Sequence, residues 1–163
     1  MKLFSGTFVG VAIFAAAAVT ASSALAATPK PILISGKYAG NASTKVEGDV
    51  VTISALGTGS ATLLGKGKIT GAGTGDSSQQ PCIPFGGTGT ITGIAGTKIT
   101  YKLLPGASSC GDEGGHVFSV KTKLTVVKAT GKLLRAKGIL TITGVYNRDD
   151  GTFSIKLFGT LKK

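Results

Sequence analysis

Apolar and polar residues alternate with a period of two along most of the chain after residue 27, and short glycine-rich stretches interrupt the alternation. This period is typical of β-strands with one buried face, and no stretch of the region repeats apolar residues at helical spacing over three turns. The pattern predicts eight strands, at residues 32–41, 48–56, 59–73, 86–93, 97–104, 116–128, 137–147 and 152–162. Residues 132–137, which lie between two glycines, are predicted to be loop or extended chain.

The well-patterned strands present one apolar face and one polar face. In the strand predicted at 116–128, Phe118 and Leu124 share one face, and Lys121 and Lys123 share the other. Antiparallel strands with one buried face each either close into a barrel or stack as two sheets. We predict an all-β, eight-stranded antiparallel barrel, because closure removes exposed sheet edges. A β-sandwich is the alternative.

The alternation of strands also assigns the loops to the two ends of the barrel. If consecutive strands run up and down, one end carries short turns around Gly57 and Gly96 together with the loop at 128–137. The other end, here called the acidic end, receives every acidic residue of the chain: Glu47, Asp49, Asp76, Asp112, Glu113, Asp149 and Asp150.

The two cysteines of the chain, Cys82 and Cys110, are predicted to form a disulfide at the acidic end. The hairpin expected from strands 86–93 and 97–104 brings residues 86 and 104 together, and the cysteines extend the chain from these two points. Closing the 29-residue loop from 82 to 110 is worth about 3 to 4 kcal/mol in the chain-entropy model. A stapled rim is therefore expected around the opening of the barrel.

The N-terminal residues have the pattern of a secretory signal peptide. Lys2 precedes an apolar run at 3–19, and the small-residue sequence Ala24-Leu25-Ala26 predicts cleavage before Ala27. We therefore expect a signal peptide at 1–26 and a single barrel domain at 27–163, secreted or periplasmic in a bacterium and without a transmembrane span after cleavage. An oxidising compartment agrees with the predicted disulfide.

The chain is strongly basic, with 18 Lys and Arg residues, 7 Asp and Glu residues and a net charge of +11. Outward-facing lysines are expected to form a basic outer face that binds an anionic envelope polymer, a lipid surface or nucleic acid, or that only maintains solubility. They are Lys66, Lys68, Lys98, Lys102, Lys121, Lys123, Lys156 and Lys162. No specific nucleic-acid binding is expected, because only two of the basic residues are Arg and aromatic residues do not interleave with the lysines.

One cluster of the sequence combines carboxylates with an imidazole: Asp112, Glu113 and His116. Glu113 and His116 are weak candidates for an acid/base pair, but their spacing matches no defined catalytic or metal motif. The favoured interpretation is a glycine-rich turn with solvated acids, in which His116 takes the first core-facing position of its strand. Asp149 and Asp150 begin a hairpin turn and lack the later ligands of a calcium loop. No cofactor and no metal site are predicted.

Three stretches resemble a known family: SATLLGKGKITG at 60–71, GTGTITGIAGTKITYKL at 87–103 and ATGKLLRAKGILTITGVYNRDDGTFSIKLFGTL at 129–161. Together they are similar to small secreted bacterial proteins with an allene oxide cyclase-like, dirigent-like β-barrel. The resemblance implies this barrel fold. Better-known enzymes with similar barrels cyclise fatty-acid epoxides or direct phenoxy-radical coupling, but no motif of this chain matches their active residues. The chain also departs from the family pattern at Lys128-Ala129 and at Leu133.

The sequence leaves three functional hypotheses. The first is an exported, non-enzymatic barrel that binds a small apolar or anionic molecule at the disulfide-framed acidic end, near Asp76, Asp112, Glu113, His116, Asp149 and Asp150. The second is a cyclase- or isomerase-like enzyme that uses Glu113 and His116 inside a barrel cavity. The third is a structural protein that binds a polyanion through its lysines, and an oligomer is compatible with all three.

Overall fold

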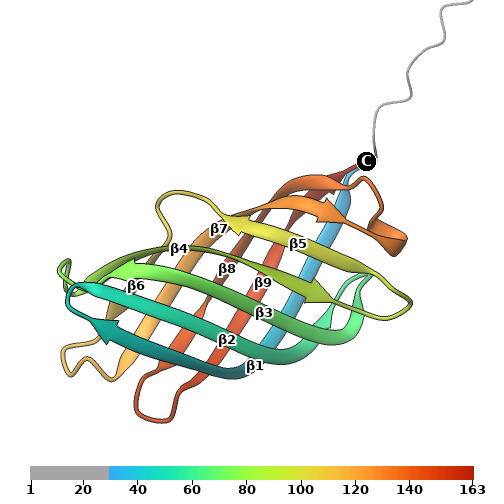
Figure 1. The fold of residues 1–163 in the computed structure, drawn as a ribbon. Coiled ribbons are helices and arrows are strands. Elements are labelled where there is room, and N and C mark those ends of the chain that lie inside the picture. The colour runs from blue at the N-terminus through green and yellow to red at the C-terminus, as the bar shows by residue number, and fades with distance from the viewer. Residues whose placement is uncertain (1–29) are drawn as a thin grey trace, which may run out of the picture.

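The computed structural model describes residues 30–163, so the signal peptide expected at 1–26 lies outside the described residues. The described chain forms nine β-strands and one short 3-10 turn (Figure 1). The strands are β1 (Ile32–Glu47), β2 (Val50–Ala61), β3 (Gly65–Asp76), β4 (Cys82–Thr92), β5 (Lys98–Leu103), β6 (Ser108–Gly111), β7 (Val117–Ala129), β8 (Lys137–Asn147) and β9 (Thr152–Lys162). The 3-10 turn η1 (Gly131–Leu133) lies between β7 and β8.

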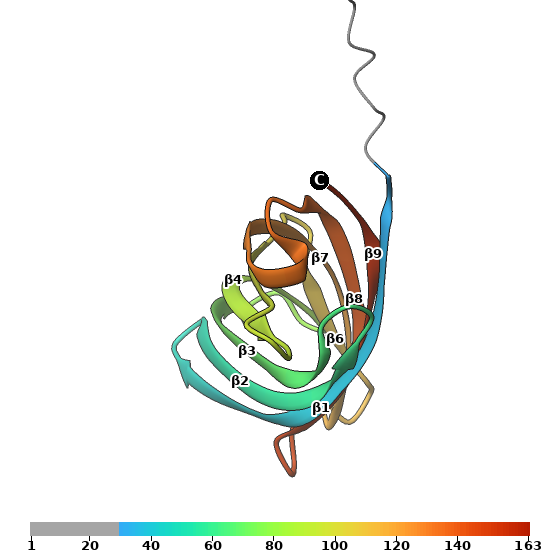
Figure 2. The same ribbon diagram turned by 90° about the vertical axis from the view of Figure 1, so that its right-hand side faces the viewer.

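The strands close into an antiparallel barrel, which Figures 1 and 2 show from two directions. Apart from β5 and β6, strands that follow one another in sequence pair around the barrel, and β1 pairs with β9 to complete it. β5 and β6 occupy one position between β4 and β7, so nine strands fill eight positions. The predicted eight-stranded antiparallel barrel is confirmed, and the β-sandwich alternative is wrong.

The predicted boundaries of the first three strands are wrong. β1 continues to Glu47 and is followed by Gly48, whose φ of +60° suits a tight turn, and β3 begins only at Gly65. Gly57, predicted to lie in a turn, lies within β2 opposite Gly40 and Ile69. Glycine is common in turns, and it also occurs inside strongly curved strands, where it allows neighbouring strands to approach closely. The sequence pattern therefore does not distinguish a glycine within a strand from one at a reversal of the chain.

Two further elements differ from the prediction. β6 lies in a region predicted to be loop, and β4 begins at Cys82 rather than at residue 86. The four residues of β6 have no apolar alternation, and their strand conformation depends on pairing with β4 and β7, which a local pattern does not reveal. Gly131–Leu133 form a 3-10 turn instead of loop or extended chain.

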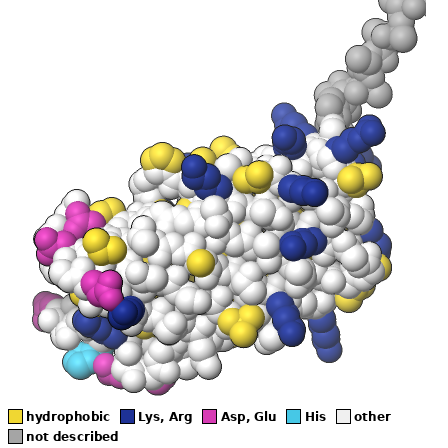
Figure 3. All heavy atoms as spheres, in the orientation of Figure 1, with side chains coloured by type: hydrophobic (Ala, Val, Ile, Leu, Met, Phe, Trp, Pro, Cys, Tyr) yellow, Lys and Arg dark blue, Asp and Glu magenta, His cyan; other side chains and the backbone are white. Residues whose placement is uncertain are grey.

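The connections between strands separate the charges of the described chain. All seven acidic residues lie in or next to four of these connections, as predicted: β1–β2, β3–β4, β6–β7 and β8–β9. The opposite end, here called the basic end, has no acidic residue among residues 30–163 and carries nine basic side chains. They are Lys30, Lys66, Lys98, Lys128, Lys132, Arg135, Lys137, Lys162 and Lys163. Figure 3 shows acidic side chains gathered at one end of the barrel, whereas most of the Lys and Arg side chains in view lie towards the other end and a few stand beside the acids.

The interior next to the basic end is filled by branched aliphatic side chains. Leu64, from the β2–β3 connection, and Leu133, from η1, are fully buried there. They join the fully buried strand residues Ile99, Leu140 and Leu161 in one cluster. Burying a side chain of this size contributes about 1.5 to 3 kcal/mol. These residues therefore close the barrel at its basic end.

The curvature of the barrel depends on glycines that allow strands to approach closely. A Cβ on Gly67 of β3 would overlap the carbonyl oxygen of Thr92 in β4. We expect Gly67→Ala to lower the free energy of unfolding by about 2 to 3 kcal/mol, as overpacking of a rigid site does. Gly86→Ala is the matched control, because a Cβ there meets nothing within 4 Å, and its effect should stay within about 0.5 kcal/mol. Urea denaturation of both variants measures the difference, and equal stabilities would contradict this role of Gly67.

Candidate functional site

A cavity of about 450 Å³ occupies the half of the barrel next to the acidic end. The exposed residues Thr44, Val46, Gln80 and Arg148 take part in its lining, so the cavity opens to solvent at that end. The rest of the lining comes mainly from inward-facing positions of the strands around the barrel. In the basic half of the barrel formed by residues 30–163, buried Leu and Ile side chains fill the interior.

The cavity exists because the first three strands carry small residues at its level. Ala42 of β1 lies opposite Ala55 of β2, and Ala55 lies opposite Gly71 of β3, so three adjacent strands present almost no side-chain volume. Phe118 and Phe153 line the cavity from β7 and β9. One part of the wall is therefore nearly bare backbone, and another is aromatic.

Tyr101 of β5 lies at the inner limit of the cavity and is 5% exposed. Its ring passes over Gly89 of β4, and its hydroxyl donates a hydrogen bond to the carbonyl oxygen of Thr70 in β3 at 3.0 Å. Burial raises the pKa of Tyr101 to about 12, so the phenol stays protonated and acts as a donor. Its hydrogen bond connects β5 to β3 across β4 and stabilises the deep part of the cavity.

The cavity lining contains one charged residue, Arg148, in the β8–β9 connection. Its backbone N–H donates to the carbonyl oxygen of His116 at 2.8 Å, which connects the β8–β9 and β6–β7 connections. Within residues 30–163, no carboxylate lies within ion-pair distance of the Arg148 guanidinium. This group is therefore available to a ligand at the opening, and the sequence prediction did not include it.

None of the six predicted mouth residues lines the cavity. All six lie at the acidic end: Asp76, Asp112, Glu113, His116, Asp149 and Asp150. Asp76 accepts hydrogen bonds from Ser78 and Gln79, and Asp150 accepts them from Thr152. These hydrogen bonds lower the pKa values of Asp76 and Asp150, since they favour the carboxylate form. The carboxylates thus stabilise the turns of the rim rather than face the interior.

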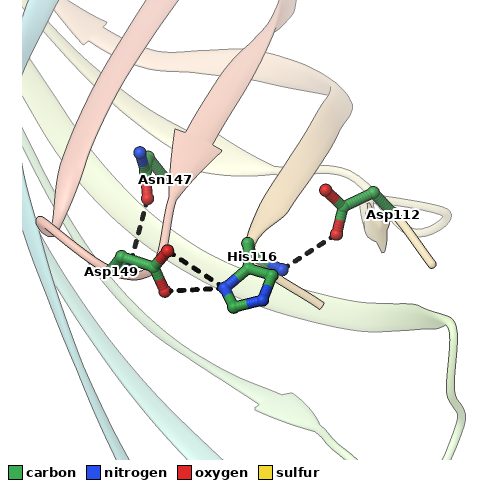
Figure 4. A network of polar contacts seen from close by, with 4 residues as sticks. All are labelled: Asp112, His116, Asn147 and Asp149. Atoms are coloured by element: carbon green, nitrogen blue, oxygen red, sulfur yellow. Dashed lines mark hydrogen bonds and ion pairs between the residues drawn. The ribbon is translucent and has the colours of Figure 1, made fainter. Parts of the chain in front are cut away.

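His116 forms an ion pair with Asp149 on the outside of the rim (Figure 4). Its Nδ1 lies 2.9 Å and 3.0 Å from the two carboxylate oxygens of Asp149, and its backbone N–H donates to Asp112 at 2.8 Å. The His116 side chain is 62% exposed, so the prediction of a core-facing histidine is wrong. The β7 strand begins one residue later, and the histidine belongs to the preceding turn.

Neither Glu113 nor His116 contacts the cavity, so the structure does not bring this predicted acid/base pair to the interior. The lining contains no Asp, Glu, His, Cys or Lys side chain. Among residues 30–163, no group of three or more potential metal-ligating side chains lies together. The geometry therefore offers apolar contact, a few hydroxyl and amide groups, and one guanidinium.

The predicted disulfide between Cys82 and Cys110 is present. The two residues lie opposite each other in the β4–β6 pair, and their neighbours Ile83 and Ser109 line the cavity. The disulfide therefore holds a section of the cavity wall, and it is consistent with an oxidising, extracytoplasmic location. In the part of the chain that the structure describes, no helix has the length and apolar character needed to span a membrane.

All eight lysines expected on the outer face are exposed: Lys66, Lys68, Lys98, Lys102, Lys121, Lys123, Lys156 and Lys162. They belong to β3, β5, β7 and β9 and point away from the barrel interior.

Removal of the disulfide provides a test of how the rim is stabilised. The double variant Cys82→Ala/Cys110→Ala should lose about 3 to 4 kcal/mol of unfolding free energy, because the cysteines are 28 residues apart and the open loop gains entropy on unfolding. Urea denaturation of the variant and of the oxidised protein measures the loss. An unchanged midpoint would show that β4–β6 pairing alone holds this part of the wall.

The pKa of His116 is raised above its usual value, first by the hydrogen bond to Asp149 and then by the charge of that carboxylate. His116 is the one histidine of the chain, so its ring signals in an NMR titration are unambiguous. Asp149→Asn should lower the pKa of His116 towards 6.5. Asp150→Asn is the control and should leave it unchanged, because Asp150 bonds Thr152 instead.

The sign of the pH dependence follows from the same ion pair. A raised pKa in the folded state means that the pair stabilises the fold fully below about pH 6.5 and that this contribution is lost as pH rises through the folded pKa. Because the pair is solvent-exposed, its contribution to stability should be small. A His116 pKa identical in the protein and in Asp149→Asn would contradict the pairing.

Comparison of the chain with protein-family models, with curated proteins and with solved structures gives no match. The resemblance to allene oxide cyclase-like barrels remains a prediction from the sequence, and the site is interpreted from its own geometry.

Proposed function

We propose that this protein binds a small, largely apolar molecule in the barrel cavity, outside the cytoplasm. The observation that carries the proposal is the cavity itself, about 450 Å³ in volume, open at one end and lined mainly by apolar side chains. Cavities of this size, with few polar groups, are typical of small-molecule sites. The filled basic half makes the site a closed-ended pocket rather than a channel.

The lining indicates which features of a ligand the site would favour. Phe118, Phe153 and Tyr146 provide aromatic surface, and the small residues of β1–β3 admit a flat group close to the backbone. Arg148 at the opening would pair with an anionic group at the outer end of the ligand. The proposed ligand is therefore apolar at its inner end and either neutral or anionic at its outer end.

The proposed setting is secreted or periplasmic. The disulfide supports it, as does the signal peptide expected at 1–26.

The cyclase- or isomerase-like alternative requires Glu113 or His116 at the cavity wall. Both side chains lie outside the lining, and the titratable groups that line the cavity are Tyr101, Tyr146 and Arg148. No observation in the described residues favours a proton-transfer step, so no reaction is proposed.

The proposal is tested with a neutral fluorescent probe, phenylnaphthylamine, whose emission rises in apolar surroundings. Ala55→Phe fills the cavity from β2 and should weaken probe binding at least about tenfold, a difference of about 1.4 kcal/mol. Ser54→Phe is the matched control, because the adjacent side chain points outward and is exposed. If Ala55→Phe does not fold, Ala55→Leu replaces it. Equal binding by the cavity variant and its control would overturn the proposal, as would no binding by the unaltered protein.

Arg148 is tested separately with the anionic analogue anilinonaphthalene sulfonate. Arg148→Gln should weaken binding of this anion several-fold and leave the neutral probe unchanged, because one charge-assisted hydrogen bond is lost. Fluorescence titration of both probes gives the two affinities. A parallel loss for both probes would indicate a disturbed opening rather than an anion contact.

A further inference from the structure

One row of residues across the outside of the barrel carries four lysines. Cross-strand pairing places Lys66 of β3 opposite Ser60 of β2, Ser60 opposite Lys37 of β1, and Lys37 opposite Lys156 of β9. The row continues from Lys156 to Thr143 of β8 and from Thr143 to Lys121 of β7. We call these six residues the lysine row. With strands about 4.8 Å apart, it spans roughly 24 Å of the curved surface.

The lysine row is electrostatically unfavourable in the isolated protein. Lys37 and Lys156 are directly opposite each other, where Cβ atoms are about 5 Å apart, and like charges in such pairs destabilise a sheet. The ion pairs within residues 30–163 join Lys45 to Glu47 and His116 to Asp149, so no lysine of the row has a carboxylate partner there. All seven acidic residues lie at the acidic end, away from the centre of the row.

A shallow groove of about 480 Å³ lies over β1 at the centre of the row. Lys37 and Lys156 line it together with the hydroxyl-bearing residues Ser35, Ser60 and Thr62 and with Phe158. Phe158 is 47% exposed and breaks the alternation of β9 by pointing outward beside Ser35. The groove thus combines two cations, several hydroxyl groups and one exposed aromatic ring.

This combination matches an anionic sugar better than other polyanions. An aromatic ring packs against the apolar face of a sugar ring, hydroxyl groups exchange hydrogen bonds with sugar hydroxyls, and lysines pair with carboxylate or sulfate groups as point charges. A nucleic acid would favour successive aromatic residues and Arg side chains, and the groove has one aromatic residue and no Arg. The spacing of lysines along the row suits a linear chain with repeated charges.

We propose that the lysine row and its central groove bind a linear anionic polysaccharide. The surface lies on the outside of the barrel wall, so the proposal is independent of ligand binding in the cavity. The repulsion between Lys37 and Lys156 would be relieved when acidic sugars lie between and beside them. Lys66 and Lys121 would extend the contact on both sides of the groove.

The test uses polygalacturonate as the anionic polysaccharide, with dextran as the neutral polymer and a single-stranded DNA oligonucleotide as the competing polyanion. Binding is measured by titration of the full mature protein at about 150 mM salt and at lower salt, where exposed charges are less screened. We expect polygalacturonate to bind at both salt concentrations, dextran not to bind, and DNA to bind only at low salt. Equal affinity for DNA and polygalacturonate would overturn the saccharide assignment, as would no binding of polygalacturonate.

The site is located with two charge-matched double variants. Lys37→Ser/Lys156→Ser removes the central pair and should weaken polygalacturonate binding about tenfold and flatten its salt dependence. Lys102→Ser/Lys123→Ser removes the same charge from exposed positions outside the row and should weaken binding less than about twofold. Equal losses in the two variants would show that net charge alone attracts the polymer and would overturn the site.

Phe158→Ser tests the aromatic contact. It should weaken polygalacturonate binding several-fold and leave the salt dependence unchanged, because no charge is removed. Thermal melting of all variants checks the fold, and Lys37→Ser/Lys156→Ser should melt no lower than the unaltered protein, since it removes a repulsion. Unchanged binding by Phe158→Ser would exclude sugar stacking at the groove.

Discussion

Closure of the sheet into a small barrel sets the interior volume that the inward-facing side chains must fill, and the other features of the molecule depend on how they fill it. A barrel of eight strands has an interior just wide enough for its inward-facing side chains to fill. Next to the basic end, Leu64, Leu133 and Leu161 occupy that room completely. Next to the acidic end, Ala42, Ala55 and Gly71 leave it partly empty. The same architecture therefore supplies a packed core that stabilises the fold and a cavity that interrupts the packing.

The cavity persists because its wall is held by interactions that do not need a filled interior. Tyr101 crosses Gly89 to bond the backbone of β3, and the Cys82–Cys110 disulfide connects β4 and β6 at the rim. Backbone pairing is continuous around the barrel, so no strand depends on side chains in the cavity for its hydrogen bonds. Because the volume next to Ala55 and Gly71 is empty, van der Waals contacts are missing there. The backbone hydrogen bonds between neighbouring strands and the disulfide offset this loss of stability.

Alternation and loop parity were sufficient to predict the fold, the inward faces and the end at which the acidic residues gather. These properties depend on the alternation of apolar and polar side chains within each strand and on the order of the strands along the chain. Both follow directly from the sequence. The strand ends around Gly48 and Gly57 were not predictable in this way, because an inward glycine in a bent strand and a turn glycine look alike in sequence. The cavity, the place of Arg148 and the lysine row depend on register, which is set only when each strand meets its neighbours. Small residues at alternate positions of one strand, such as Gly71 and Gly73 of β3, were the one sequence signal of the cavity.

The charge distribution constrains what can enter the cavity. Seven carboxylates surround or adjoin the end where it opens, and at physiological salt their influence extends about 8 Å. The carboxylates repel an anion that approaches this end, whereas Arg148, which lines the cavity and has no carboxylate partner in residues 30–163, attracts it. A neutral apolar molecule meets no such barrier. For the ligand proposed above, this charge distribution would favour entry by the apolar part, with any negative group following as far as Arg148, and the proposed polysaccharide would meet the lysines on the outer surface.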